Sequence, residues 1–233
     1  MSELIENHDF FLFDIEGTTT SVDFVYEVLF PYAKDNLEVY WKENYSQLGD
    51  VIELVRETVL SEKLEENYSD PKEYFSLLEK WIDQDRKHTG LKLLQGKMWK
   101  LGYESGELEA HFFEDFPPFL EKLKSRDKKI GIYSSGSVQA QKLIFQYSEF
   151  GDLSSYIGHN FDTQVGAKGD VSSYQTIISE IQCLPERVIF FSDVIMELDA
   201  ASSSGMRAIH SLRGKDSSRH ERYTCFQSFD ELH

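Results

Sequence analysis

The sequence contains few of the features that would indicate a zinc protein, a membrane protein or a secreted protein. Its 233 residues include only two cysteines, Cys183 and Cys225, with no CxxC pair and no His/Cys grouping typical of zinc sites. No stretch approaches the roughly 18 apolar residues of a membrane helix. The opening residues, MSELIENHDF, lack the basic and apolar segments of a secretory signal. We therefore expect a cytoplasmic protein without a membrane partner.

Positive charge is also scarce. The chain has 24 Lys and Arg against 41 Asp and Glu, a formal net charge of −17. A surface of this sign repels nucleic acids and anionic membranes at long range, so we expect no nucleic-acid partner. An anionic ligand would have to be bound by local cations, backbone N–H groups or a metal ion.

Short apolar runs alternate with helical segments at the start and in the second half of the chain. Runs typical of buried parallel strands lie at 10–13, 129–134, 187–193 and 206–211. Segments with helical character lie at 138–147, 171–182 and 195–204. Strands that alternate with helices predict an α/β fold, in which a parallel sheet has helices on both faces.

Residues 21–110 differ from the rest, because they show helical periodicity and few strand signals. Apolar residues recur three and four positions apart within 51–60 and 74–82, which favours helices packed around their own core over a cofactor groove. The segment GYESGE (102–107) and the pair Pro117-Pro118 are typical of a return to the α/β part. The sequence thus predicts two domains, residues 1–20 with 111–233 and residues 21–110.

Acidic and polar side chains follow the predicted strands of the α/β part. Because ligands bind at the carboxyl edge of a parallel sheet, we expect these side chains to meet there. The set consists of Asp14, Glu16, Ser134, Lys168, Asp193 and Glu197.

Four carboxylates in such a set would repel one another unless a counter-charge lay between them. Oxygen ligands without a Cys/His set favour a hard cation, most simply Mg²⁺. A phosphate could then contact the ion, Lys168 and the Ser134 hydroxyl. The backbone N–H groups of residues 17–19 and 136 could add further hydrogen-bond donors. The pattern therefore favours a phosphate-binding site that depends on magnesium.

In a site of this kind Asp14 would attack phosphorus, and Glu16 would act first as an acid and then as the base that activates water. Each residue also has a simpler interpretation when taken alone. Asp14 and Asp193 could cap a turn or a helix, Lys168 could be a solvated loop residue, and Glu197 could lie on a helix surface.

The segment Asp14-Ile-Glu-Gly-Thr-Thr resembles the first motif of the haloacid dehalogenase-like phosphatases, which usually reads Asp-x-Asp-Gly-Thr. Glutamate at the third position is characteristic of one branch. Further stretches resemble that branch, the enolase-phosphatases of methionine salvage: VYEVLFPYA (25–33), LQGKMWKLGY (94–103), IYSSGSVQAQKLIF (132–145), GAK (166–168) and FSDVIMELDAA (191–201).

The resemblance implies a haloacid dehalogenase-like Rossmannoid core and a helical cap formed by residues 21–110. It implies a Mg²⁺-dependent enolase-phosphatase, or acireductone synthase, acting through an aspartyl-phosphate at Asp14. Such an enzyme enolises 2,3-diketo-5-methylthiopentyl-1-phosphate and removes its phosphate, which gives 1,2-dihydroxy-3-keto-5-methylthiopentene. The expected partner is this small phosphorylated diketone, and we expect a monomer.

Matching positions imply the roles of individual residues. Asp14 and Glu16 would be catalytic, and Asp14, Glu16 and Asp193 would form the metal site, with Glu16 contributing its backbone carbonyl. Ser134, Ser135 and Lys168 would bind substrate. Glu197 would be the acid next to the metal site.

Other functions remain open from the sequence. One is a small-molecule phosphatase or phosphomutase of the same superfamily that lacks enolase activity. A second is a hydrolytic dehalogenase, which needs no Mg²⁺ and would not require both Asp193 and Glu197. A third is a non-catalytic binding module, for which loss of a motif acid would be expected. Glu16 and Lys168 are both candidates for the proton transfer during enolisation, and Lys168 could instead polarise a carbonyl.

Overall fold

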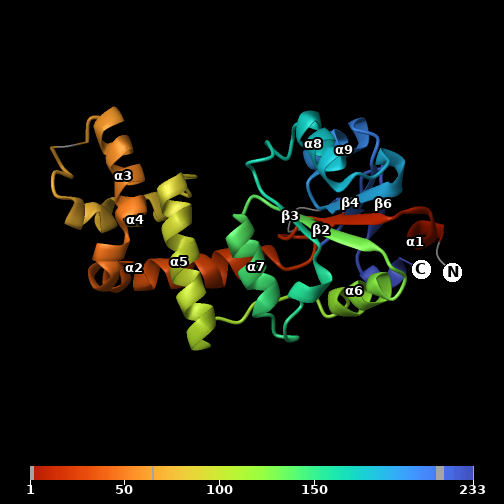
Figure 1. Cartoon of the computed structure of the whole chain (residues 1–233), viewed down its shortest axis with the longest axis horizontal. Coiled ribbons are helices and arrows are strands. Elements are labelled where there is room, and N and C mark those ends of the chain that lie inside the picture. The colour runs from red at the N-terminus through yellow and green to blue at the C-terminus, as the bar shows by residue number, and fades with distance from the viewer. Residues whose placement is uncertain (1–2, 65, 214–217, 233) are drawn as a thin grey trace. The chain divides into compact units, whose positions relative to one another are not determined.

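The computed structural model describes residues 3–64, 66–213 and 218–232, which form two compact units (Figure 1). The division falls between Phe24 and Val25 and again between Leu108 and Glu109, so the second unit is inserted into the first. Residues 1–2, 65, 214–217 and 233 of the predicted domains lie outside the described part.

The first unit contains a parallel sheet, as the sequence predicted. In the described residues its strand order is β3-β2-β1-β4-β5-β6. The strands are β1 (Phe10–Phe13), β2 (Lys129–Tyr133), β3 (His159–Phe161), β4 (Val188–Ser192), β5 (Arg207–Ser211) and β6 (Thr224–Phe226). β1 lies in the middle, where Phe13 pairs with Ile132 on one side and Phe191 on the other. The end of β1 is therefore central in the carboxyl edge of the sheet.

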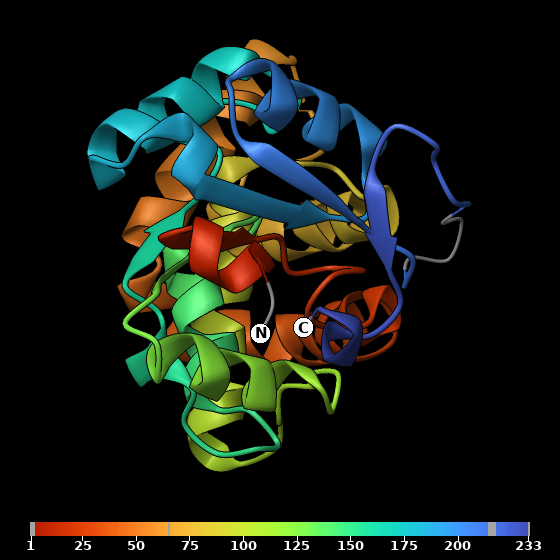
Figure 2. The same cartoon turned by 90° about the vertical axis from the view of Figure 1, so that its right-hand side faces the viewer.

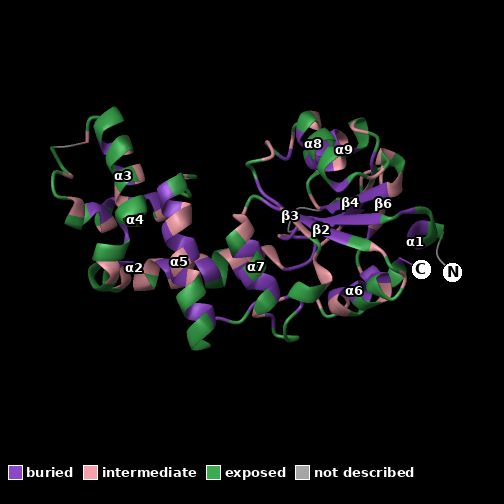
Figure 3. Ribbon diagram, in the orientation of Figure 1, coloured by how far each residue is buried: buried purple, intermediate pink, exposed green. Residues whose placement is uncertain are grey.

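Helices cover both faces of this sheet (Figures 1 and 2). One face carries α8 (Val171–Ile181) and α9 (Ile195–Ser203), and the other carries α6 (Phe116–Lys124) and α7 (Val138–Gln146). Successive side chains of β1 point to opposite faces, and all four are fully buried (Figure 3). The predicted α/β fold with a doubly covered parallel sheet is confirmed.

Four helices and strands of this unit were not predicted: α1 (Glu3–Asn7), α6, β3 and β6. β3 reads His-Asn-Phe and β6 reads Thr-Cys-Phe, so neither contains an apolar run long enough to indicate a strand. Pro117 and Pro118, expected near the return to the α/β part, lie within the first unit in the first turn of α6, where proline costs no hydrogen bond.

The chain leaves and re-enters the first unit at neighbouring points. The imidazole Nδ1 of His111 lies 2.9 Å from the Thr20 hydroxyl and accepts the Ser21 N–H at 3.4 Å. Two residues further, the Phe113 N–H donates to the Thr19 carbonyl at 3.0 Å. The outgoing and returning segments are thus held together within this unit.

The second unit is helical, as predicted for this part of the chain. A π-helix at Phe24–Leu29 leads into α2 (Phe30–Asn44), followed by α3 (Gly49–Ser61), α4 (Tyr74–Asp83) and α5 (Thr89–Ser105). Its own core contains Trp41 and Trp81, and Trp99 packs against this core while donating to the Leu29 carbonyl at 2.9 Å. The apolar stripes read from the sequence are therefore packing surfaces.

His88 caps the N-terminus of α5. Its Nδ1 accepts the backbone N–H groups of Gly90 and Leu91 at 3.1 and 3.4 Å, and its Nε2 lies 2.8 Å from the Thr58 hydroxyl. This arrangement requires a neutral imidazole with the proton on Nε2. In the described parts of both units, every helix is too short or too polar to span a bilayer.

Candidate active site

Asp14 lies at the carboxyl edge of the sheet, directly after β1. Its N–H still donates to the Phe191 carbonyl at 2.9 Å, which continues the pairing with β4 and fixes where the side chain begins. The carboxylate is almost fully buried, with the residue 3% exposed. Four buried aromatic and aliphatic residues in β1 thus place an acid in an environment where its charge needs a partner.

The loop after Asp14 is closed by its own backbone. Gly17 has φ +72°, a conformation that favours glycine, and a Cβ there would lie 2.3 Å from Oδ2 of Asp193. The absence of a side chain at Gly17 therefore allows Asp193 to approach the loop. The Ser211 hydroxyl, at the end of β5, donates to the Gly17 carbonyl at 2.9 Å and holds the turn in place.

The expectation that the N–H groups of residues 17–19 face a phosphate is wrong for this structure. The Gly17 N–H donates to the Thr20 carbonyl at 2.8 Å, and those of Thr18 and Thr19 donate to the Ile15 carbonyl. The Gly136 N–H is likewise used, since it donates to the Ser134 hydroxyl at 3.1 Å. These donors close their own turns because a buried N–H without a partner is costly.

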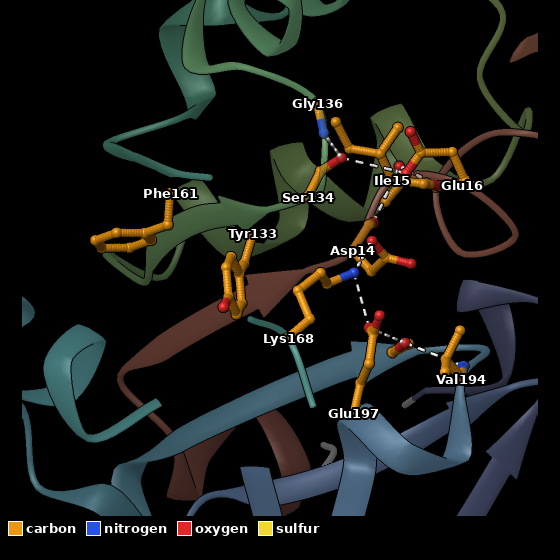
Figure 4. A network of polar contacts seen from close by, with 12 residues as sticks. Asp14, Ile15, Glu16, Tyr133, Ser134, Gly136, Phe161, Lys168, Val194 and Glu197 are labelled. Carbon is orange, nitrogen blue, oxygen red and sulfur yellow. Dashed lines mark hydrogen bonds and ion pairs between the residues drawn. The ribbon is translucent and has the colours of Figure 1, made fainter. Parts of the chain in front are cut away.

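Ser134 and Glu16 contact each other across the sheet edge (Figure 4). The Ser134 hydroxyl, fully buried at the end of β2, donates to Oε2 of Glu16 at 3.2 Å. Glu16 is partly exposed, and Ser135 is exposed on the following loop. The sequence thus correctly predicted that Glu16 and Ser134 lie at the same edge of the sheet, but it did not predict the hydrogen bond between them.

Lys168 lies between two carboxylates (Figure 4). Its Nζ is 2.5 Å from Oδ1 of Asp14 and 2.7 Å from Oε2 of Glu197, and the Lys168 side chain is 7% exposed. Glu197 is on the first turn of α9, and the Ser192 hydroxyl donates to the same carboxylate at 2.8 Å. The ammonium is therefore fixed from both sides at the sheet edge.

The pKa values of this cluster are shifted by burial and by the excess of acids over bases. Burial raises the pKa of Asp14 well above its usual range, and the negative charge of Glu197 adds to the effect while Lys168 opposes it. For Lys168, burial alone would lower the pKa, but Asp14 and Glu197 outweigh it and raise the pKa above its ordinary value. Burial, with a contribution from Glu197, raises the pKa of Asp193 to about 6. Lys168 is thus a stable cation, but its single positive charge does not balance the negative charge of the surrounding carboxylates.

The structure places the predicted residues in two directly bonded groups. Asp14, Lys168 and Glu197 form one, and Glu16 with Ser134 forms the other, while Asp193 lies against Gly17. Asp193 does not cap α9, because the N-cap residue is Val194.

Sequence reasoning missed three supporting hydroxyls, those of Ser192, Tyr133 and Tyr174, which bond to Glu197, Gly166 and Lys168 respectively. A hydroxyl that donates to a distant carbonyl or carboxylate leaves no periodic or spacing signal in the sequence.

A family model, described as haloacid dehalogenase-like hydrolase, matches residues 8–205. Among curated proteins, Enolase-phosphatase E1 of Leptospira interrogans is 42% identical over 208 residues, 88% of either chain. Enolase-phosphatase E1 of a Picosynechococcus strain is 41% identical over 227 residues, which cover 96% of this chain and 99% of the relative.

Two solved structures are also similar to this chain. The UTR4 protein of Saccharomyces cerevisiae has a TM-score of 0.79 and 30% identity, over 97% of this chain and all of that one. CbbY from Rhodobacter sphaeroides, solved in complex with phosphate, has a TM-score of 0.58 at 17% identity, over 97% of this chain and 96% of that one. The second likeness concerns the fold alone.

Proposed function

The chain belongs to the haloacid dehalogenase-like hydrolases and, within them, to the enolase-phosphatases, and from this we propose that it converts 2,3-diketo-5-methylthiopentyl-1-phosphate to an acireductone. The reaction comprises enolisation of the diketone and hydrolysis of the phosphate ester. The observation that carries this proposal is the buried Asp14–Lys168–Glu197 array, which lies beside Asp193 at the carboxyl edge of the sheet.

We assign the phosphate transfer to Asp14 and Glu16. A carboxylate oxygen of Asp14 forms a bond to phosphorus while the bond from phosphorus to the substrate oxygen breaks. Glu16 gives its proton to the departing oxygen and then takes one from the water that attacks the aspartyl-phosphate, so that phosphate leaves and Asp14 is regenerated. The hydrogen bond from Ser134 supports this role, because it fixes the partly exposed carboxylate of Glu16 two residues along the chain from the buried nucleophile Asp14.

The two candidates for proton transfer in enolisation differ in this structure. Lys168 is paired with two carboxylates, which raise its pKa, so at neutral pH it is a cation that can polarise an oxygen but cannot accept a proton. Glu16 carries no such ion pair among the contacts described. We therefore propose that Glu16 removes the proton. Lys168, Ser134 and Ser135 would bind the phosphate or a carbonyl oxygen of the substrate.

The side chains at this edge fit a magnesium ion in chemistry, since they offer oxygen ligands and excess negative charge. Within the described residues no three His, Cys, Asp or Glu side chains converge as a ready metal site. The ion would therefore be held by Asp14, Asp193 and the Glu16 carbonyl. When bound, it would neutralise the carboxylates and orient the phosphate.

The helical unit is proposed to act as the cap that closes over the substrate and excludes water. Its predicted limits, residues 21–110, and the assignment of 1–20 with 111–233 as the phosphatase core remain predictions from the sequence. The same holds for the cytoplasmic location, the monomeric state, and the lack of nucleic-acid and membrane partners.

One experiment tests the proposal directly. Purified protein is incubated with the diketo phosphate, with and without Mg²⁺, while enol absorbance and phosphate release are recorded. We expect enol to appear before phosphate, and both to require Mg²⁺. Phosphate release without an enol would favour another phosphatase of the superfamily, and no release at all would favour a binding module.

The variant Asp14→Asn is the matched test of the nucleophile. It keeps the size of the side chain and its place at the end of β1. We expect phosphate release to fall by at least about 10³-fold, in line with the loss of an essential group in other covalent catalysts, while circular dichroism stays that of the wild type. A fully active Asp14→Asn protein would refute the assignment.

A further inference from the structure

Three consecutive backbone carbonyls in the loop that carries Lys168 each accept a hydrogen bond from a side-chain hydroxyl. Tyr133 donates to Gly166 at 3.0 Å, Ser173 donates to Ala167 at 2.7 Å, and Tyr174 donates to Lys168 at 2.8 Å. The Ala167 carbonyl also accepts the Asp170 N–H at 3.0 Å. Here the whole segment 166–168 is held by hydroxyls from two other elements, β2 and α8.

The three donors are themselves buried and closely packed. Tyr133, Ser173 and Tyr174 are fully buried. The rings of Tyr133 and Tyr174 pack edge to face with centroids 5.5 Å apart, and Tyr174 packs against Phe190 of β4 at 5.2 Å. Burial raises the pKa of both tyrosines, so their hydroxyls keep their protons and remain donors. The loop is therefore fixed to the sheet and to α8 through rigid groups.

Gly166 shows how tightly the loop fits. Its φ is +135°, and a Cβ at this position would lie 2.1 Å from the Ser173 hydroxyl oxygen. Only glycine allows the Ser173 hydroxyl to pass and reach the Ala167 carbonyl. The position of Ser173 and the identity of residue 166 are thus coupled.

We propose that Tyr133, Ser173 and Tyr174 are positioning residues that hold the Lys168 ammonium at the site of phosphate transfer. The inference rests on the proposed function, because it assigns to these hydroxyls a role in placing a phosphate-binding cation. A lysine side chain has four rotatable bonds, so the place of its ammonium depends on where its backbone is fixed. We call these three hydroxyls the hydroxyl clamp. Its Tyr174 hydroxyl acts on Lys168 most directly, because it donates to the lysine's own backbone carbonyl.

The clamp matters most when Asp14 carries the phosphoryl group. In the free protein the Asp14 carboxylate holds the Lys168 ammonium at 2.5 Å. Once Asp14 carries the phosphoryl group, its own carboxylate charge is gone and the negative charge lies on the phosphoryl oxygens. The ammonium must then meet those oxygens from a position set by Glu197 and by its fixed backbone. Errors of about 1 Å in the placement of a catalytic group can cost 10²-fold in rate. Loosening the loop should therefore impair turnover more than it impairs folding.

The test uses Tyr174→Phe, which removes one hydroxyl and keeps the ring. Inorganic phosphate is titrated by calorimetry into the full-length wild type, Tyr174→Phe, Lys168→Ala and the double variant, and turnover of the diketo phosphate is measured in each. We expect Tyr174→Phe to lower kcat and phosphate affinity about tenfold in the wild-type background. In the Lys168→Ala background, the same change should alter phosphate affinity by less than twofold, because the hydroxyl acts through the lysine.

Tyr74→Phe is the matched control. It is a buried tyrosine in the core of the helical unit and has no part in the loop, so its phosphate affinity and kcat should equal those of the wild type. Should Tyr174→Phe fail to fold, Tyr133→Phe carries the same test with the same expected direction.

The outcomes separate the two claims. Equal losses from Tyr174→Phe with and without Lys168 would overturn the positioning role. An active wild type whose kcat and phosphate affinity are matched by the Tyr174→Phe variant would overturn it as well. A wild type that releases no phosphate from the diketone would overturn the proposed function, whereas a Lys168-dependent loss of phosphate affinity would still support the clamp.

Discussion

Replacing His88 should remove a pH-dependent part of the stability of the helical unit. His88 caps α5 through an unprotonated Nδ1, which accepts two backbone N–H groups. A proton on that nitrogen would abolish the acceptor and place a positive charge at the N-terminus of a helix, where the helix dipole opposes it. The variant His88→Asn keeps an acceptor that is well suited to this position but does not titrate.

The size of the effect follows from these contacts. Loss of an N-cap acceptor costs about 1 kcal/mol, and an unfavourable charge at a helix end adds about 0.3–1 kcal/mol. Protonated His88 should therefore destabilise the helical unit by roughly 1–2 kcal/mol. For domains of 60–100 residues, each kcal/mol corresponds to a shift of about 4–8 °C in Tm.

The direction of the pH dependence is set by the folded-state pKa. Burial lowers the pKa of His88, and the charge of Arg86 lowers it further, while Glu62 opposes this. The fold thus favours the neutral form. Its stabilising effect is complete above the unfolded pKa of about 6.5 and is lost as the pH falls below that value through the lowered folded pKa.

The tryptophans provide a selective assay, because all three, Trp41, Trp81 and Trp99, lie in the helical unit. Urea unfolding is followed by tryptophan fluorescence at pH 7.5 and pH 5.0 for the wild type and His88→Asn. Between these pH values the wild type should lose about 1–2 kcal/mol more than the variant. Equal losses in the two proteins would refute the reasoning.

Two further substitutions test other features. Gly17→Ala would bring a Cβ into contact with Asp193, so phosphate release should fall by about 10²-fold, and the left-handed φ should cost about 1–2 kcal/mol of stability; a fully active variant would contradict the close approach. Arg213→Ala removes the cation paired with the Asp115 carboxylate, which keeps hydrogen bonds from the Ser228 hydroxyl and the Phe229 N–H, so the change should cost about 3 kcal/mol in urea unfolding. The exposed ion pair of Arg187 with Asp9 serves as its control, because solvent screens it and Arg187→Ala should destabilise the protein far less than Arg213→Ala does.

The parts of the fold that could be predicted are those with a periodic signal. The Phe10–Phe13 run and the similar runs before Ser134 and Asp193 each became a central strand, because only a sheet buried on both faces accommodates continuous apolar residues. The edge strands β3 and β6 gave no such signal, since three-residue strands of mixed polarity depend on pairing with a neighbour.

The candidate site could be located from the sequence, but its contacts could not. Strand ends brought Asp14, Ser134 and Asp193 to one edge by topology alone. The ion pair between Lys168 and Glu197 joins a loop to a helix, and its geometry depends on how α9 packs, which no local pattern records. The N–H groups of the loop after Asp14 were expected to face a ligand, because the sequence does not show that Thr20 and Ile15 carbonyls use them first.

The contact of His111 with Thr20 has a consequence for how this chain can change over evolutionary time. Where the ends of an inserted segment are already adjacent, the loop-closure entropy of the host depends only weakly on the length of the insert. Insertions and deletions between these ends should therefore change the stability of the sheet that carries Asp14 only slightly. Residues 25–108 can vary, or be exchanged for a different module, while the strand order and the acids at its edge stay as they are.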